Sequence, residues 1–288
     1  MPRLFCFGYS YTAKALVRRL RSSPEGNDWQ ISATVRKGKE AAPIEEGGVD
    51  AHLFGDAESR TALEQASHIL TSIPPVTGGD PVLDAYSETL ADLKPVWLGY
   101  LSTTGPYGDC GGAWVDETAP THPSGERGQR RLDAENAWTS LCQKNHLPLH
   151  IFRLPGLYGP GRSSLNRVRD GSARRIVKQD QVFSRIHIDD LAAILKASMD
   201  HPKEHALYNI ADDLPAPPQD VTAFAAGLLG LEPPPEVPFE EADLSTMARS
   251  FYADNKRISN RLIKSELGIK LRYPTYREGL KAILDAEN

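Results

Sequence analysis

Short runs of apolar and β-branched residues alternate with helical patterns over the first two-thirds of the chain. Between the first two runs, Ala13, Leu16, Val17 and Leu20 recur at the spacing of one helix face. Strands that alternate with helices indicate βαβ units, and right-handed crossovers arrange such units into an α/β, doubly wound parallel sheet. The expected strands cover residues 3–7, 30–35, 51–54, 68–73, 96–102 and 149–154.

The last third departs from this alternation. The pattern returns once, with a helix that carries Leu191, Ile194 and Leu195 and a strand over residues 206–212. The Pro-rich segment EPPPEVPFEE predicts an extended connector, and the helical tail is expected to stop at Leu267-Gly268 and restart after Pro274. We therefore expect a large domain over residues 1–158, rejoined by 187–212, and a small, discontinuous domain of residues 159–186 and 213–288.

Composition sets limits on partners and surroundings. An apolar content of 40% and a charged content of 25% are ordinary for a soluble globular protein. The net charge of -5 gives no general attraction to nucleic acid or to an anionic membrane, so neither is expected as a partner. Without a secretory signal or a bilayer-spanning window, a cytoplasmic location is expected. The three cysteines are widely spaced, which predicts reduced thiols and no metal site.

The turn after the first expected strand reads Gly8-Tyr9-Ser10-Tyr11-Thr12-Ala13. A dinucleotide-binding fold needs a tight turn and a close backbone approach to pyrophosphate at this place. Ser10 stands for the second glycine of the usual pattern and Ala13 for the third. We expect Gly8, Ser10, Tyr11 and Ala13 to contact a dinucleotide, although an ordinary strand-to-helix turn also favours Gly and Ser.

Basic residues follow the second expected strand, where Arg36, Lys37 and Lys39 stand. Folds that prefer NAD usually place an acidic residue there to hold the ribose hydroxyls. A guanidinium suits the 2′-phosphate of NADP instead, so NADP is expected as cofactor, with NAD as the weaker alternative. A solvated basic turn is the other interpretation.

The stretch LSTTGPYGDCGGAWVDETAP, followed by HPSGERGQRRLDAENAW, ends at residue 138. It resembles extended short-chain dehydrogenase/reductases of the NAD-dependent epimerase/dehydratase type, and implies a Rossmann-type sheet with a small C-terminal substrate domain and a cleft where the two meet. In that family the helix carries Tyr, then Lys four residues later, then Glu. Alignment on Glu135 puts Arg131 at the lysine position and Arg127 at the tyrosine position, as in an atypical branch that lacks the tyrosine.

The resemblance also implies roles for individual residues. Thr103 would bind a substrate oxygen, and Arg131 would supply charge and hydrogen bonds to the nicotinamide ribose. Arg127 is the third candidate catalytic residue, but a guanidinium does not deprotonate and cannot replace the phenol. A solvated helix face made of Arg127, Arg131 and Glu135 is the alternative. Further expected cofactor contacts are Asp56, Ser72, Pro74, Leu154 and Pro155.

Tyr107, Tyr158 and His187 are candidates for the missing proton donor, although each also has a plausible packing role. Between Pro160 and Arg185 seven basic residues face only two acidic ones. By resemblance this segment borders the substrate site, which predicts an anionic or nucleotide-sugar ligand; a solvated basic patch is the alternative. The expected substrate-binding residues are Tyr107, Tyr158, Arg162 and Arg185.

The sequence therefore predicts an NAD(P)-dependent epimerase/dehydratase-like or reductase-like protein that acts on a small, anionic molecule. Loss of the tyrosine favours the second hypothesis, a non-catalytic dinucleotide-binding sensor or scaffold. Fold alone does not decide between them. The oligomeric state stays open between a monomer and a homodimer.

Overall fold

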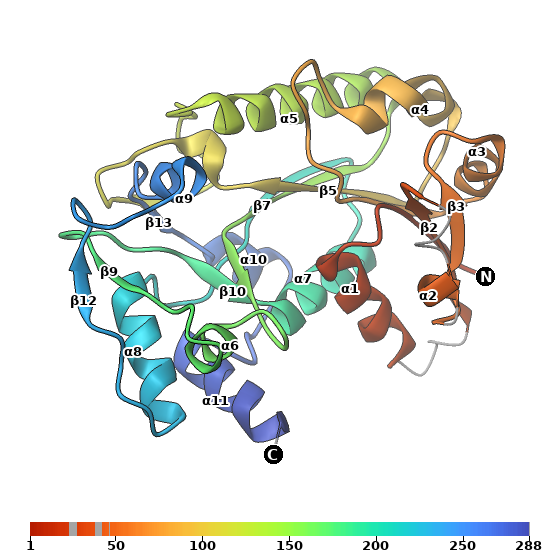
Figure 1. Ribbon diagram of the computed structural model, residues 1–288. Coiled ribbons are helices and arrows are strands. Elements are labelled where there is room, and N and C mark those ends of the chain that lie inside the picture. Colours follow the sequence, from red (N-terminus) through yellow and green to blue (C-terminus); the bar gives the residue numbers. More distant parts are fainter. Residues whose placement is uncertain (23–27, 38–41, 46, 288) are drawn as a thin grey trace. The chain divides into compact units, whose positions relative to one another are not determined.

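The computed structural model describes residues 1–22, 28–37, 42–45 and 47–287 (Figure 1). The chain divides into two compact units. Unit 1 consists of Met1–Thr103, Gln129–Arg153 and Leu191–Tyr208, and unit 2 of Thr104–Gly128, Leu154–Asp190 and Asn209–Asn288. The domain limits drawn from the sequence stay a prediction.

Unit 1 is built on a seven-stranded sheet with the strand order β11-β7-β5-β4-β1-β2-β3. Strand pairs such as β1 with β2 and β1 with β4 are parallel. The predicted α/β fold class, a Rossmann-type doubly wound parallel sheet, is confirmed. The strands are β1 Arg3–Phe7, β2 Gln30–Val35, β3 Asp50–Leu53, β4 His68–Thr71, β5 Trp97–Thr103, β7 Leu149–Leu154 and β11 His205–Asn209.

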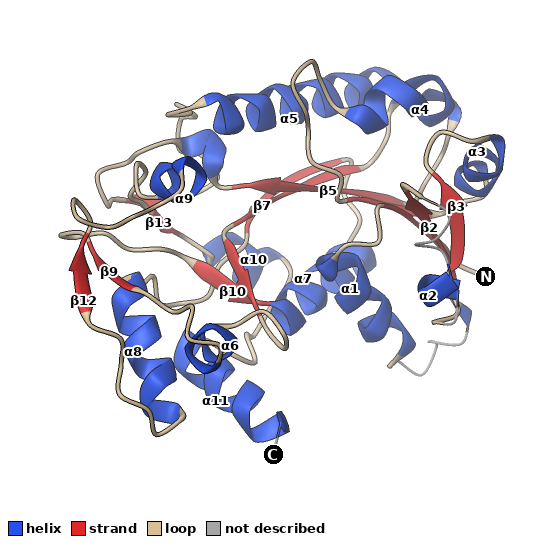
Figure 2. Cartoon of the chain, viewed as in Figure 1, coloured by secondary structure: helices blue, strands red, loops and turns tan. Residues whose placement is uncertain are grey.

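Helices cover both faces of this sheet, with α3, α4 and α5 on one face and α1 and α7 on the other (Figures 1 and 2). Ser10, Asp56 and Asp80 cap α1, α3 and α4 by accepting hydrogen bonds from first-turn backbone N–H groups. The helices are α1 Tyr11–Arg21, α2 Ala42–Glu45, α3 Ala57–Glu64, α4 Pro81–Asp92, α5 Glu126–Asn145 and α7 Ile188–Asp200.

The core on the α4 and α5 face is aromatic. Phe7, Tyr86, Tyr100 and Trp138 are all completely buried and belong to one cluster. Trp138 Nε1 donates to Asp80 Oδ2 at 3.1 Å, so the only polar atom of this side chain is satisfied inside the core. Burial of side chains of this size is the main force that holds α5 on the sheet.

Unit 2 contains three short parallel strand pairs rather than one sheet. They join β8 Gly156–Tyr158 to β10 Arg185–His187, β9 Arg175–Val177 to β12 Glu236–Pro238, and β6 Trp114–Val115 to β13 Arg257–Ile258. The Pro-rich connector thus contributes β12. The helices are α6 Ser164–Arg169, α8 Pro218–Leu228, α9 Thr246–Phe251, α10 Arg261–Glu266 and α11 Tyr276–Glu287, and a 3-10 turn, η3, covers Gly105–Tyr107.

In the described ranges, no helix is both long and apolar enough to cross a membrane.

Candidate functional site

The turn between β1 and α1 is held by its neighbours in unit 1. Gly8 has a φ of 82°, and a Cβ at this position would lie 3.2 Å from both Ile73 Cγ1 and Ser72 Oγ. Gly8 N donates to Thr34 Oγ1 at 2.9 Å, and Ser72 Oγ lies 3.1 Å from both Phe7 O and Gly8 O. Only glycine fits such a backbone without strain.

This turn lies at the carboxyl end of β1, where the strand order reverses. β1 is bordered by β4 on one side and by β2 on the other, and doubly wound sheets bind their ligands outside such a reversal point. The structure therefore brings Gly8 and Ser72 together. Ser10 lies in the same turn, where its hydroxyl accepts from Ala13 N at 3.2 Å and caps α1.

The other expected cofactor contacts in unit 1 include residues that follow β2, β3 and β4. Arg36 and Lys37 are exposed directly after β2, and Lys39 lies outside the described residues. Asp56 caps α3 by accepting from Ser59 N at 2.7 Å, and this backbone hydrogen bond holds the pKa of Asp56 below its ordinary value. Pro74 is exposed in the loop after β4.

The centre of unit 1 holds a buried ion pair that the sequence analysis missed. Arg153 on β7 binds Glu135 on α5, with Nη2 at 2.7 Å from Oε2, and the two residues are 5% and 4% exposed. Ser102 Oγ also donates to Glu135. A charged residue in the otherwise apolar run LHIFRL was the signal that could have revealed a buried partner, because lone buried charges are very costly.

This ion pair overturns the interpretation of Arg127, Arg131 and Glu135 as a solvated helix face. Glu135 is in the core and pairs with β7, so it does not balance the charges of its helix neighbours. Arg131 instead donates to Tyr100 OH at 3.1 Å and Leu101 O at 3.0 Å. Burial raises the pKa of Tyr100 to about 12 against the opposing effect of Arg131, so this phenol is a poor proton donor.

Thr103 ends β5, next to Ser102, and is half-buried. Successive residues of a strand point to opposite faces, so Thr103 faces away from the Ser102 contact with Glu135. Leu154, the last residue of β7, accepts a hydrogen bond from Thr104 N at 3.1 Å through its carbonyl group, and Pro155 follows it directly.

In unit 2 the three candidate proton donors are packed against other groups. Tyr107 is 1% exposed, and its phenol donates to Asn209 Oδ1 at 2.8 Å. The phenol of Tyr158 donates to Thr275 O at 3.3 Å, and burial raises its pKa above the ordinary value. The His187 ring lies 5.2 Å from the Tyr158 ring and 4.1 Å from the Tyr273 ring, between centroids.

Much of the basic charge between Pro160 and Arg185 is engaged inside unit 2. Arg169 pairs with Glu287 at 2.5 Å and Arg175 with Glu236 at 2.6 Å. The Arg185 guanidinium donates to Ala216 O at 3.1 Å and lies over the Tyr276 ring. Arg162 is exposed beside the Gly159 turn. The local charge excess read from the sequence is thus smaller in the folded unit.

Arg127 lies in the first turn of α5, which approaches η3 closely. A Cβ on Gly128 would lie 2.9 Å from Gly105 O, so glycine at this position permits the approach. The guanidinium of Arg127 lies over the Phe251 ring, 5.3 Å from its centroid. Arg127 and Arg131 therefore have separate partners, one in each unit.

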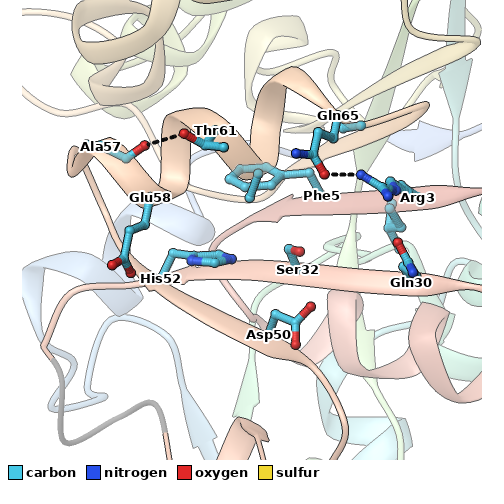
Figure 3. A pocket seen from close by; sticks show the side chains of 13 residues that line it. Arg3, Phe5, Gln30, Ser32, Asp50, His52, Ala57, Glu58, Thr61 and Gln65 are labelled. Carbon is cyan, nitrogen blue, oxygen red and sulfur yellow. Dashed lines mark hydrogen bonds between the residues drawn. The ribbon is translucent and has the colours of Figure 1, made fainter.

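A hollow of about 450 Å³ lies in unit 1 beside α3, over strands β1, β2 and β3 (Figure 3). Phe5 contributes to its lining, Arg3 donates to Gln65 at one end, and Glu58 and His52 lie near each other at the other. None of the expected site residues lines it, so it is separate from the candidate site.

A family model described as the NAD dependent epimerase/dehydratase family matches residues 75–211, which include β5, α5 and β7. The chain belongs to this family. The match covers the stretch on which the resemblance to extended short-chain dehydrogenase/reductases was based, so that prediction is confirmed.

Individual relatives extend the similarity over the whole chain. A functionally unknown conserved protein from Silicibacter pomeroyi DSS is 47% identical, with 100% of both chains covered and a TM-score of 0.90. Protein YeeZ of Escherichia coli (strain K12) is 28% identical over 276 residues, which cover 88% of this chain and 92% of YeeZ. MoeE5, solved in complex with UDP-glucose and NAD, shares the fold at 18% identity and a TM-score of 0.75, with 100% and 99% of the chains covered.

Proposed function

We propose that this protein binds a nicotinamide dinucleotide through unit 1, with NADP preferred over NAD. The observation that supports this proposal is the turn around Gly8, between β1 and α1. A glycine with positive φ, packed on Ser72 and Ile73 at the point where the strand order reverses, lets a pyrophosphate approach the backbone where a side chain would block it. MoeE5, which shares the fold, was solved with NAD.

The preference for NADP rests on the residues after β2. Arg36 and Lys37 are exposed there, and the usual ribose-binding acid is absent from this position. Two cations would attract a 2′-phosphate, and a guanidinium can bind it with two parallel hydrogen bonds. The adenosine ribose of NAD would gain less binding free energy from these two cations, because its hydroxyls need a hydrogen-bond acceptor as well as a donor.

We further propose a reductase-like or epimerase-like step on a small, anionic molecule of the nucleotide-sugar class, the class to which the UDP-glucose bound by MoeE5 belongs. The bound cofactor would supply the hydride chemistry. Thr103 would donate its hydroxyl to a substrate oxygen, and Arg131 would contribute fixed positive charge at the end of β5. Neither Arg127 nor Arg131 can take the place of the family's tyrosine as an acid.

A second candidate function is a non-catalytic dinucleotide sensor or scaffold. The packing of the three alternative proton donors favours it, because Tyr107, Tyr158 and His187 all lie in buried contacts. Hydride transfer to nicotinamide in a panel of carbonyl compounds and nucleotide sugars separates the two functions. Turnover of any member supports the enzyme, and cofactor binding without turnover of any member supports the sensor.

The cofactor proposal is tested by thermal unfolding at equal concentrations of NADPH and NADH. A ligand that binds only the native state raises Tm according to its affinity, so NADPH should give the larger shift. Arg36→Asp should reverse the order of the two shifts, because it removes a hydrogen-bond donor to the 2′-phosphate and adds a carboxylate that repels this phosphate. Lys270→Asp, an equal charge change at an exposed residue of unit 2, is the matched control. Equal shifts for both cofactors in the wild type contradict the preference.

A further inference from the structure

Arg127 has an unusual set of surroundings for a residue at the family's tyrosine position. It is exposed, and across the described ranges its guanidinium makes no hydrogen bond or ion pair with the protein. Its recorded contact is the Phe251 ring, 5.3 Å away. A guanidinium that lies over a ring keeps its N–H donors at its edge, where they can bind another group.

Phe251 offers a matching open surface. It is 54% exposed although it is large and apolar, and Met247, one turn earlier on α9, is 61% exposed. Residues four apart share one face of a helix, so the two side chains form a single apolar strip. The Arg127 guanidinium lies at the Phe251 end of this strip.

The strip is presented by an anchored helix. Tyr252, directly after Phe251, is 9% exposed and packs in a cluster with Ile176 and Ala242. Lys178 Nζ donates to Tyr252 O, and Ser245 Oγ caps the helix by accepting from Ala248 N at 3.2 Å. Tyr252, the residue that caps the C-terminal end of α9, thus holds the helix in place, while Met247 and Phe251 on the helix itself are exposed.

We propose that Arg127, Phe251 and Met247 form a subsite for a ligand that combines an anionic oxygen group with a flat apolar face, such as one face of a sugar ring. The anionic group, a carboxylate or a phosphate, binds the guanidinium edge of Arg127. The apolar face packs on Phe251 and Met247. Arg127 therefore serves in binding, where the family has a proton-transferring phenol. The subsite rests on the proposed function in one respect: the ligand that it binds is taken to be the substrate of the proposed reaction.

The charged part and the apolar part of the subsite should contribute differently to the affinity for the ligand. Hydrogen bonds between ions are worth more than those between neutral groups, so loss of the guanidinium should cost about tenfold or more in affinity. Loss of the aromatic face should cost about threefold to tenfold, because ring contacts contribute less than a charge-assisted hydrogen bond.

The test is calorimetric titration of the full chain, with and without NADPH, using UDP-glucuronic acid, UDP-glucose, glucuronate and glucose 1-phosphate as probes. Arg127→Met should weaken binding about tenfold or more, Arg127→Lys should restore part of it, and Phe251→Leu should weaken it several-fold. If the carboxylate is the bound group, Arg127→Met affects UDP-glucuronic acid and spares UDP-glucose. If a phosphate is bound, both nucleotide sugars weaken equally.

Lys144→Met removes an exposed cation at the far end of the same helix and should change nothing. Unchanged Tm values for the Arg127 and Phe251 variants verify folding, because both side chains are exposed. The subsite is overturned if no probe binds the wild type, or if Arg127→Met and Phe251→Leu bind as the wild type does. Probe binding that depends on Arg127, together with failure to bind NADPH or NADH, would overturn the cofactor proposal and leave the subsite in place.

Discussion

At the level of single residues, alignment on Glu135 predicts that Arg127 and Arg131 replace the family's tyrosine and lysine, and the structure gives these two arginines different surroundings. Arg131 is tied to Tyr100 and Leu101 of β5, whereas Arg127 lies over Phe251. Only the first contributes a fixed charge to the end of β5. Thr103 ends the same strand, and its hydroxyl stays the group proposed to bind a substrate oxygen.

Thr103→Ala should abolish turnover of any substrate found by screening and leave NADPH affinity nearly unchanged. The hydroxyl is expected to donate a hydrogen bond to the reacting oxygen, and removal of one such donor typically lowers the rate by about 10² to 10³. Single-turnover nicotinamide absorbance measures the first effect and a cofactor titration the second. Thr104→Ala, one residue further along, is the matched control and should stay active. Full activity in Thr103→Ala would remove Thr103 from the site.

At the level of elements, the main sheet was predictable and the small strand pairs were not. The runs at residues 30–35 and 149–154 agree with β2 and β7, because apolar and β-branched residues make up most of both runs, as is typical of buried parallel strands. Strands of two or three residues, such as β6 and β13, leave no period in the sequence. β6 and β13 form because residues over a hundred positions apart in the sequence pair in the fold.

The candidate site likewise has one part that could be predicted from the sequence and one part that could not. The turn at Gly8 and Ser10 could be predicted because a strand, a glycine and a capping residue are adjacent in the sequence. The contact between Glu135 and Arg153, and that between Arg127 and Phe251, could not, because each joins separate elements. Spacing along α5 suggested pairs within the helix, and tertiary packing replaced them.

The Glu135 and Arg153 pair should hold α5 to β7. Glu135→Gln leaves a buried guanidinium without its counter-charge, so the free energy of unfolding should fall by about 3 kcal/mol. Urea denaturation measures the loss. Glu126→Gln, at an exposed position in the first turn of α5, is the control and should change stability by less than about 1 kcal/mol.

A double variant, Glu135→Leu with Arg153→Met, distinguishes the pair itself from its unpaired charge. Apolar residues of similar volume often replace a buried ion pair at little cost. The double variant should therefore be more stable than Glu135→Gln alone. If Glu135→Gln unfolds at the same urea concentration as the wild type, the pair is not important for stability.

At the scale of the whole molecule, charge is distributed less simply than the sequence suggests. The chain carries a net charge of -5, and its basic segment in unit 2 is largely engaged with carboxylates and carbonyl groups. In the same unit, Asp212 is 1% exposed, and its Oδ2 has no hydrogen-bond partner among the described residues. Its Oδ1 accepts from Leu214 N at 3.2 Å. Burial of a carboxylate with one unsatisfied oxygen favours the protonated form, which makes the stability of the protein depend on pH.

Burial raises the pKa of Asp212 from 3.8 to about 7, against the opposing charge of Arg185, while Asp213 and Asp190 act in the same direction as burial. Folded Asp212 then keeps its proton up to about pH 7, whereas the unfolded chain releases it near pH 3.8. Unfolding releases a proton between these values, so the free energy of unfolding falls as pH rises through this window. A pKa raised from 3.8 to about 7 corresponds to a loss of about 4 kcal/mol in the free energy of unfolding across this window.

Asp212→Asn should remove this dependence, because the amide stays neutral. Urea denaturation should show the variant close to the wild type near about pH 4 and more stable than it near about pH 8, by up to about 4 kcal/mol. Asp285→Asn, at an exposed position of α11 in unit 2, is the matched control and should leave both the stability and its slope between these pH values nearly unchanged. Stability curves for wild type and Asp212→Asn that run parallel over the whole range would show that Asp212 is ionised in the folded protein. The orphaned Oδ2 would then have a partner that neutralises its charge.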